Sequence, residues 1–216
     1  MKITKETAII HVTRLATYLL IVWGFYRFLF RLPEEIEELV IKPLIWLIPV
    51  VYYVKKEGLG ISSLGITTKK LFPAIYLALG LGALFALEGV LVNAVKYEQI
   101  VFNANIGQRA LLVSLGLSLA TAVSEEITFR GYMYSRLAYA LGNEWKANIL
   151  SSLVWGLIHL PISIFWFELS ISGVIGFFLL TTIFGIGSAF IFSKTRNVLS
   201  SILLHVLWTW PIVLFR

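Results

Sequence analysis

The stretch that decides the fold reads Ser124-Glu125-Glu126-Ile127-Thr128-Phe129-Arg130-Gly131. It places three ionisable side chains inside a run that otherwise has the composition of a membrane-spanning helix. An ionised carboxylate at the centre of a bilayer costs roughly 3 kcal/mol on insertion scales, so such groups face a protein interior, find partners and usually mark function. The sequence therefore predicts a polar site that is buried between transmembrane helices.

Within this stretch the two glutamates have different surroundings. Glu126 and Arg130 are four residues apart, which puts them on one helical face with the acid N-terminal to the base, the favourable order for an ion pair. Glu125 lies about 100° further round the helix and has no basic residue at that spacing. A buried ion pair that only fixes helix packing would leave this second carboxylate unexplained. Glu125 is therefore the carboxylate that we expect to be available for chemistry.

Composition indicates an integral membrane protein. Of the 216 residues, 58% are hydrophobic and 14% charged, and the mean hydropathy is +0.85. Cysteine is absent and all twelve acidic residues are glutamate, which excludes thiolate metal sites, cysteine nucleophiles and an aspartic dyad. There is also no His-Glu-x-x-His and no Gly-x-Ser-Gly motif. The net charge of +6 is spread over short loops, so we expect no nucleic-acid partner.

The apolar runs predict an all-α fold, a polytopic membrane helix bundle of about seven transmembrane helices. We expect residues 1–216 to form a single integral membrane domain, with the lipid bilayer as its first partner. The second run contains two prolines and is expected to be kinked. The predicted spans are residues 7–30, 39–54, 71–95, 109–136, 146–167, 170–192 and 198–215.

Basic residues orient this bundle. Eleven lie at the N-terminus and in alternate connections, against six on the other side, with Arg130 set aside as intramembrane. The excess predicts a multi-pass protein of the cell membrane with a cytoplasmic N-terminus and an external C-terminus. At a rise of 1.5 Å per residue, Glu126, His159 and His205 then lie roughly 15, 19 and 13 Å from the cytoplasmic side. The polar residues of three different spans are thus predicted to share one layer.

Three four-residue spacings carry a family resemblance. They are Glu125-Glu126-x-x-x-Arg130, Trp155-x-x-x-His159 and His205-x-x-x-Thr209, in this order and each on its own apolar segment. Together they resemble the pattern of the CAAX protease and bacteriocin-processing family, also called CPBP or Abi, which includes type II CAAX prenyl endopeptidases. The resemblance covers about residues 110–212. Two positions depart from the pattern, which more often has Phe at Trp155 and usually has Asn or Asp at Thr209.

The resemblance implies a catalytic role for four residues and a hydrolytic activity. Glu125 and His159 would activate a water molecule, and His205 with Thr209 would form the oxyanion hole. Glu126, Arg130 and Trp155 would support them. The residues themselves allow the same chemistry, since a glutamate and a neutral imidazole can share a water and deliver its proton without any nucleophilic side chain. The expected function is an intramembrane endopeptidase of CAAX-box protein processing, acting on a membrane-associated or prenylated protein or peptide, with no cofactor expected.

Three alternatives stay open at this point. Glu125, His159 and His205 would be ligands if the enzyme were a zinc metalloendopeptidase, because two imidazoles and a carboxylate are a known catalytic set. The same polar layer would also serve a proton or ion relay in a transporter, although no inverted repeat is visible. A non-catalytic immunity or scaffold protein is the third alternative.

Two ionisable residues lie outside the motifs. His11, near the start of the first span and beside Arg14, is expected to be an interfacial residue. Glu88, in the third span, is an isolated intramembrane acid and a weaker functional candidate because it lies near the end of its segment.

Overall fold

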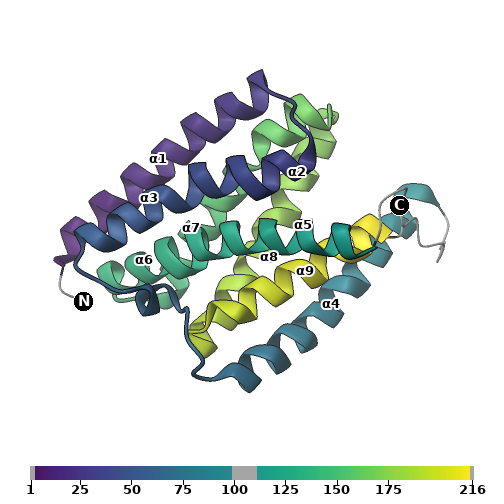
Figure 1. Cartoon of the computed structure of the whole chain (residues 1–216). Coiled ribbons are helices and arrows are strands. Elements are labelled where there is room, and N and C mark those ends of the chain that lie inside the picture. Colours follow the sequence, from purple (N-terminus) through teal and green to yellow (C-terminus); the bar gives the residue numbers. More distant parts are fainter. Residues whose placement is uncertain (1–2, 99–110, 215–216) are drawn as a thin grey trace.

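The computed structural model describes residues 3–98 and 111–214, and within these ranges every regular element is a helix (Figure 1). The predicted all-α membrane bundle is therefore confirmed. Three helices change locally to wider, π-helical turns (η1, η3, η4), and η2 is a short 3₁₀ turn. The elements are α1 (Lys5–Leu29), α2 (Glu34–Ile36), η1 (Glu37–Ile41), α3 (Lys42–Lys56), η2 (Ile61–Leu64), α4 (Leu71–Tyr97), α5 (Leu111–Glu126), η3 (Ile127–Tyr134), α6 (Ser135–Leu141), α7 (Glu144–Ile158), η4 (Ile162–Trp166), α8 (Ile171–Thr195) and α9 (Val198–Leu214).

Joined end to end, these elements make seven helical segments in the described part of the chain. Five are long and apolar enough to cross a membrane, and Val198–Thr209 is a shorter apolar helix. The remaining segment runs from α2 through η1 to α3 and carries several charges. The five long segments are Lys5–Leu29, Leu71–Val92, Leu112–Leu141, Glu144–Trp166 and Ile171–Thr195.

Polar residues set the helix boundaries. The side chains of Thr4, Asn143 and Ser170 each accept a hydrogen bond from a backbone N–H of the first turn of α1, α7 and α8. At the other end of α6, Gly142 adopts the left-handed conformation that terminates a helix. These caps place the helix ends within a few residues of the predicted span ends. The predicted loop at 96–108 and the start of the fourth span at Arg109 lie mostly outside the described residues.

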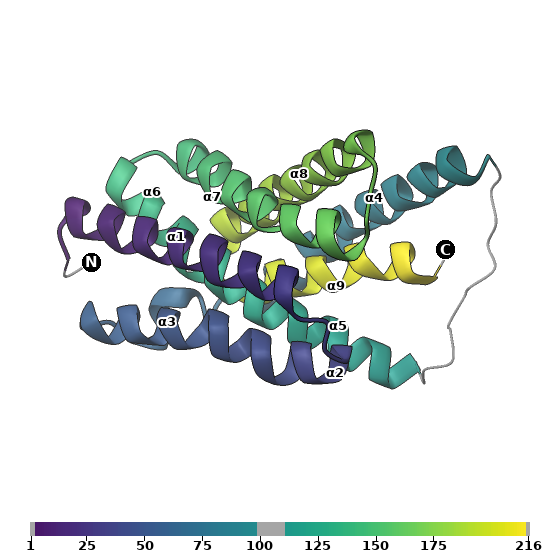
Figure 2. The same ribbon diagram turned by 90° about the horizontal axis from the view of Figure 1, so that it is seen from above.

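The helices lie roughly side by side, with α1 and α4 at opposite edges of the bundle (Figure 1). The α9 helix packs between α4 and α5, and α7 packs against α8. In Figure 2, α1 begins at one end of the bundle and α9 finishes at the other. This arrangement agrees with an odd number of crossings.

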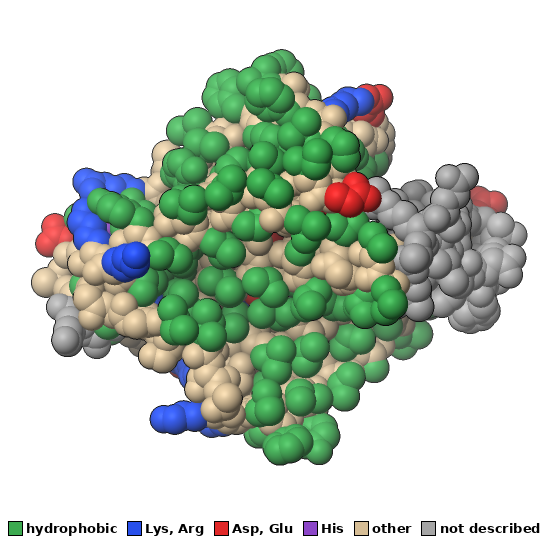
Figure 3. Space-filling model, in the orientation of Figure 1, with side chains coloured by type: hydrophobic (Ala, Val, Ile, Leu, Met, Phe, Trp, Pro, Cys, Tyr) green, Lys and Arg blue, Asp and Glu red, His purple; other side chains and the backbone are tan. Residues whose placement is uncertain are grey.

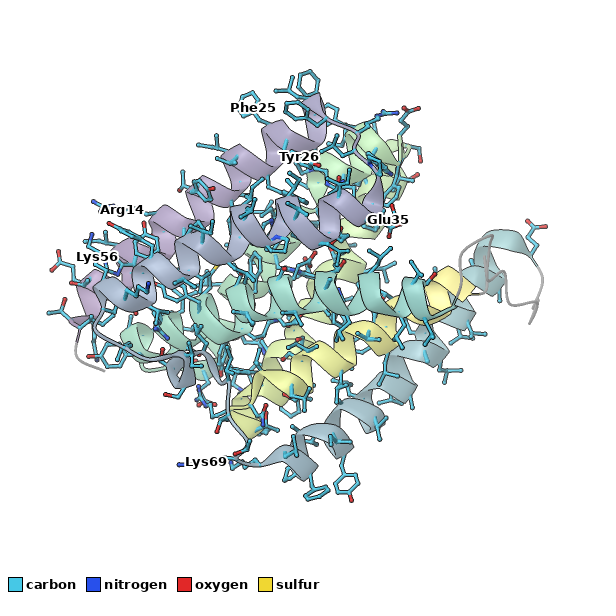
Figure 4. The ribbon with its side chains drawn as sticks, viewed as in Figure 1. Arg14, Phe25, Tyr26, Glu35, Lys56 and Lys69 are labelled. Atoms are coloured by element: carbon cyan, nitrogen blue, oxygen red, sulfur yellow. The ribbon has the colours of Figure 1, made fainter. Side chains whose placement is uncertain are left out.

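The surface matches a membrane environment. Hydrophobic side chains cover the middle of the face that Figure 3 shows, across several helices, and the charged side chains lie mainly toward its margins. In Figure 4, Phe25 points outward from α1, whereas Arg14, Lys56 and Lys69 lie toward the end where α1 begins. Glu35 lies toward the opposite end. The protein is therefore an integral membrane protein.

Candidate active site

The motif residues lie where regular helices end or widen. Glu125 and Glu126 are the last residues of α5, directly before the π-helical turns of η3. His159 follows the last residue of α7, and η4 begins three residues later. His205 lies within α9. Wide turns of this kind occur mostly as short local features inside α-helices and are frequent at functional sites.

Glu125 is 4% exposed, and its two oxygens have different partners. Oε2 accepts a hydrogen bond of 2.9 Å from Nε1–H of Trp155 and lies 3.7 Å from Nε2 of His159. Oε1 lies 3.1 Å from the ammonium nitrogen of Lys42. The structure thus brings Glu125 and His159 together from α5 and α7. Glu125 has no basic residue at the helical spacing, as the sequence indicated, but Lys42 approaches it from another helix.

The tautomer of His159 follows from the hydrogen-bond partner of its Nδ1 atom. Nδ1 lies 2.7 Å from the carbonyl oxygen of Trp155, which can only accept, so Nδ1 carries the proton. In the neutral ring, Nε2 is then an acceptor, and this is the nitrogen that faces Glu125. The His159 side chain is 17% exposed, against 5% for Glu125. A proton-accepting carboxylate and a proton-accepting imidazole nitrogen therefore face a common space.

Glu126 forms a second, fully buried unit. Its Oε1 lies 3.2 Å from Nη1 of Arg130, as predicted from the four-residue spacing, and 2.8 Å from Nδ1 of His205. Its Oε2 accepts a hydrogen bond of 2.8 Å from the Ser188 hydroxyl. Arg130 also donates to the carbonyl oxygen of Gly185 at 3.1 Å. This unit joins η3, α8 and α9 and holds the His205 ring in a fixed orientation.

Thr209 lies one turn beyond His205, but its hydroxyl is engaged elsewhere. Its Oγ1 lies 3.0 Å from the carbonyl oxygen of His205 and 3.0 Å from the hydroxyl of Ser118. A hydroxyl has a single proton to donate. The structure therefore shows Thr209 linking α9 to α5, and its predicted contact with an oxyanion stays a prediction.

Aromatic rings enclose the two Glu–His pairs. The Trp155 ring is fully buried, lies 5.9 Å from the His205 ring and has the Arg130 guanidinium 4.9 Å from its centre. Phe184 stacks on Trp208 at 4.3 Å between ring centres and lies 5.2 Å from His205. Low polarity around the charged groups strengthens their interactions. Trp155, which sequence analysis placed among the supporting residues, contacts the carboxylate directly.

A buried ionic network that the motifs do not include leads from Glu125 toward η1. Lys42 bridges Glu125 to Glu38, whose Oε2 also accepts a hydrogen bond of 2.5 Å from Thr121. Arg27 pairs with Glu37 and lies 4.0 Å from Glu38. By sequence, Lys42 belongs to the six bases on the outer side of the predicted bundle. An intramembrane cation beside Pro43 was the signal that would have identified it, on the same grounds as Arg130.

A second ionic cluster lies apart from the motif residues. Glu57 accepts from Tyr132 at 2.6 Å and from Arg136 at 2.8 and 2.9 Å, and it lies 3.0 Å from Nδ1 of His11. His11 is 4% exposed and Arg136 fully buried. His11 is therefore buried inside the protein against Glu57, which follows α3, and its predicted interfacial depth stays a prediction. Glu88 is partly buried on α4 near Trp208 and does not join either cluster.

The zinc alternative, with Glu125, His159 and His205 as ligands, stays a prediction. Among the described residues, no group of three His, Cys, Asp or Glu side chains is placed to hold a metal ion. The ammonium group of Lys42 already occupies one face of Glu125, and a divalent cation there would meet a like charge.

The fold and the site define a class, a polytopic helical membrane protein with two Glu–His pairs buried among its helices. The family model of the type II CAAX prenyl endopeptidase Rce1-like proteins matches residues 107–211. This part of the chain is therefore similar to an Rce1-like domain, and it contains Glu125, His159 and His205. No curated protein matches the chain.

Proposed function

We propose that this protein is an intramembrane endopeptidase that hydrolyses a peptide bond of a prenylated, CAAX-type protein or peptide with a water molecule activated by Glu125 and His159. The observation that carries the proposal is the 3.7 Å approach of Glu125 Oε2 to His159 Nε2 inside an Rce1-like domain. Both atoms can accept a proton from one water placed between them.

The reaction follows from these positions. The water oxygen attacks the carbonyl carbon of the scissile peptide bond while its proton passes to the Glu125 carboxylate, assisted by the imidazole of His159. The C–N bond of the tetrahedral intermediate then breaks, and the proton held by Glu125 moves to the departing amine nitrogen. The products are a carboxylate and an amine, and no covalent enzyme intermediate forms.

His205 is the proposed donor to the oxyanion. Its Nδ1 lies 2.8 Å from Glu126, so a doubly protonated ring keeps one N–H on this carboxylate and directs Nε2–H at the intermediate. Arg130 holds Glu126 in place from the other side. Loss of one such donor typically costs about 3 kcal/mol of transition-state stabilisation.

The substrate class rests on the family and on the membrane setting. The family name refers to prenyl endopeptidases, and a prenylated chain end partitions into the bilayer in which this site lies. We place the protein in the cell membrane with its N-terminus in the cytoplasm, where basic residues predominate in the sequence.

Cleavage of a defined peptide tests the proposal. Purified protein in liposomes is given a fluorogenic peptide that ends in a farnesylated CAAX sequence, or the same peptide without the lipid, and mass spectrometry identifies the products. We expect cleavage of the farnesylated peptide and much slower cleavage of the other. Absence of cleavage of both peptides by folded protein would contradict the proposal and favour an immunity, scaffold or transport role.

The metal-dependent alternative is tested on the same preparation. We expect activity to survive titration with a chelator, since the proposed chemistry uses only side chains and water. Stoichiometric zinc in the purified protein, with activity lost on chelation and restored by the metal, would establish the zinc metalloendopeptidase instead.

A further inference from the structure

Lys42 is a buried cation that neither the motifs nor the Rce1-like match includes. It is the first residue of α3, far outside residues 107–211, and is 3% exposed. A lysine ammonium in the interior of a membrane protein is costly unless it is paired, and such residues usually have a function. Lys42 lies within hydrogen-bonding distance of a residue proposed to perform the chemistry, so its role concerns the site itself.

The ammonium group connects two carboxylates on different helices. It lies 2.6 Å from Oε2 of Glu38, 2.9 Å from Oε1 of the same residue and 3.1 Å from Oε1 of Glu125. The rings of Trp23 and Trp46 surround it, with their centres 5.5 and 5.9 Å from the nitrogen. Lys42 is thus fixed by Glu38 and by aromatic rings, and it presents its remaining donor capacity to Glu125.

The two oxygens of Glu125 are distinguished by these contacts. Oε1 is held by Lys42, whereas Oε2 receives Nε1–H of Trp155 and faces His159. A carboxylate that rotates freely would present either oxygen, or neither, to the water beside His159. A general base works only when the accepting atom lies within reach of the proton.

We propose that Lys42 is a positioning residue that holds Oε1 of Glu125 and so directs Oε2 toward His159 and the water. The proposal rests on the function proposed above. It assigns to the segment Glu34–Lys56 a part in the active site that the matched domain lacks on its own. The competing explanation is that Lys42 only neutralises Glu38 and stabilises the fold.

A double variant separates these explanations. Lys42→Met removes the charge and leaves the buried Glu38 with only Arg27, at 4.0 Å, as a basic partner, so it can fail simply by unfolding. Lys42→Met with Glu38→Gln removes both charges and is compared with Glu38→Gln alone. We expect the double variant to melt close to the Glu38→Gln protein in detergent. Its kcat should nevertheless be lower than that of Glu38→Gln by about tenfold or more, with KM changed by no more than about threefold.

Equal kcat values for the double variant and Glu38→Gln would overturn the proposal and leave Lys42 a purely structural role. A change in KM with unchanged kcat would also overturn it. Lys55→Met is the matched control, because Lys55 is exposed on the same helix, and it should behave as wild type. Failure of the proposed function would be distinguishable, since wild-type protein would then not cleave the farnesylated peptide at all.

Discussion

Trp155 of α7 contacts Glu125 of α5 through its indole nitrogen. Its indole N–H donates to Oε2 of Glu125, and its backbone carbonyl fixes the tautomer of His159. The family that the chain resembles more often has Phe at this position, and a phenyl ring cannot donate a hydrogen bond to a carboxylate. The exchange therefore adds a hydrogen bond to the atom that we propose accepts the proton.

Trp155→Phe should fold and lose part of its activity. The phenyl ring keeps most of the contacts with Phe184 and Arg130 but leaves Oε2 without its donor. A hydrogen bond to a charged group is worth about 1.5 to 3 kcal/mol, so we expect kcat to fall about tenfold or more with a small change in KM. Steady-state kinetics on the farnesylated peptide measure this. A wild-type kcat would show that the indole N–H has no part in the reaction.

Thr209→Val should retain activity within about tenfold of wild type, because the structure directs the hydroxyl at His205 carbonyl oxygen and Ser118. His205→Ala, in contrast, should lower kcat by about two to three powers of ten. The two variants are compared in the same kinetic assay. If Thr209→Val falls as far as His205→Ala, Thr209 donates directly to the oxyanion, as the family resemblance implies.

The sequence was enough to predict contacts between residues that are close in the chain and groupings of residues at a similar depth in the membrane. Glu126 and Arg130 are one helical turn apart, so their pairing follows from helix geometry. The helical rise placed both histidines in the layer of the glutamates. Lys42 could not be assigned to Glu125 in this way, because the two residues are 83 positions apart and only the packing of α3 against α5 brings them together.

At the level of the helices, the apolar runs predicted the segments, but not the wide turns within them. The η3 turns contain Gly131, where an added Cβ would lie 2.8 Å from the carbonyl oxygen of Leu64. This close approach is a tertiary contact with η2, which a local pattern does not report. The π-helical turns begin directly after Glu126 and so affect the geometry of the site, whereas the sequence alone identified only its residues.

Close packing of α7 against α8 depends on Gly156, which follows Trp155. A Cβ at this position would overlap the hydroxyl oxygen of Thr182 and touch the ring of Phe178 at 3.0 Å. Gly156→Ala should therefore separate the helices, lower the melting temperature in detergent and reduce kcat through displacement of His159.

Gly176→Ala is the matched control for Gly156→Ala. Nothing lies within 4 Å of the Cβ that alanine would add at Gly176 on α8. This substitution should leave melting temperature and kcat unchanged or raise stability slightly, because alanine favours helix. Equal behaviour of the two variants would contradict the packing argument.

Across the whole molecule, the charges that orient the bundle differ from those that build its interior. Among the eleven bases predicted on the cytoplasmic side, Arg136 is buried. Among the six predicted on the outer side, Arg27 and Lys42 are buried. Without them, eleven against six bases becomes ten against four. The predicted orientation therefore keeps its basis after the buried bases are removed.

Labelling of single cysteines tests this orientation, and the chain has no native cysteine to remove. Lys56→Cys and Lys69→Cys should react with a membrane-impermeant maleimide only from the cytoplasmic side, since both residues lie toward the end where α1 begins (Figure 4). Glu35→Cys should react only from the other side. Labelling of all three from one side would contradict the topology.

We propose that Glu125 is the base that activates water, and the turnover of purified Glu125→Gln tests this role most directly. The amide keeps the size of the side chain but cannot accept the proton of water as a carboxylate does. The exposed Glu144, which pairs with Arg196, provides the control variant Glu144→Gln. We expect Glu125→Gln, folded by its melting curve, to lose activity on the farnesylated peptide by about 100-fold or more while Glu144→Gln matches wild type. Turnover of Glu125→Gln at the wild-type rate would contradict the account.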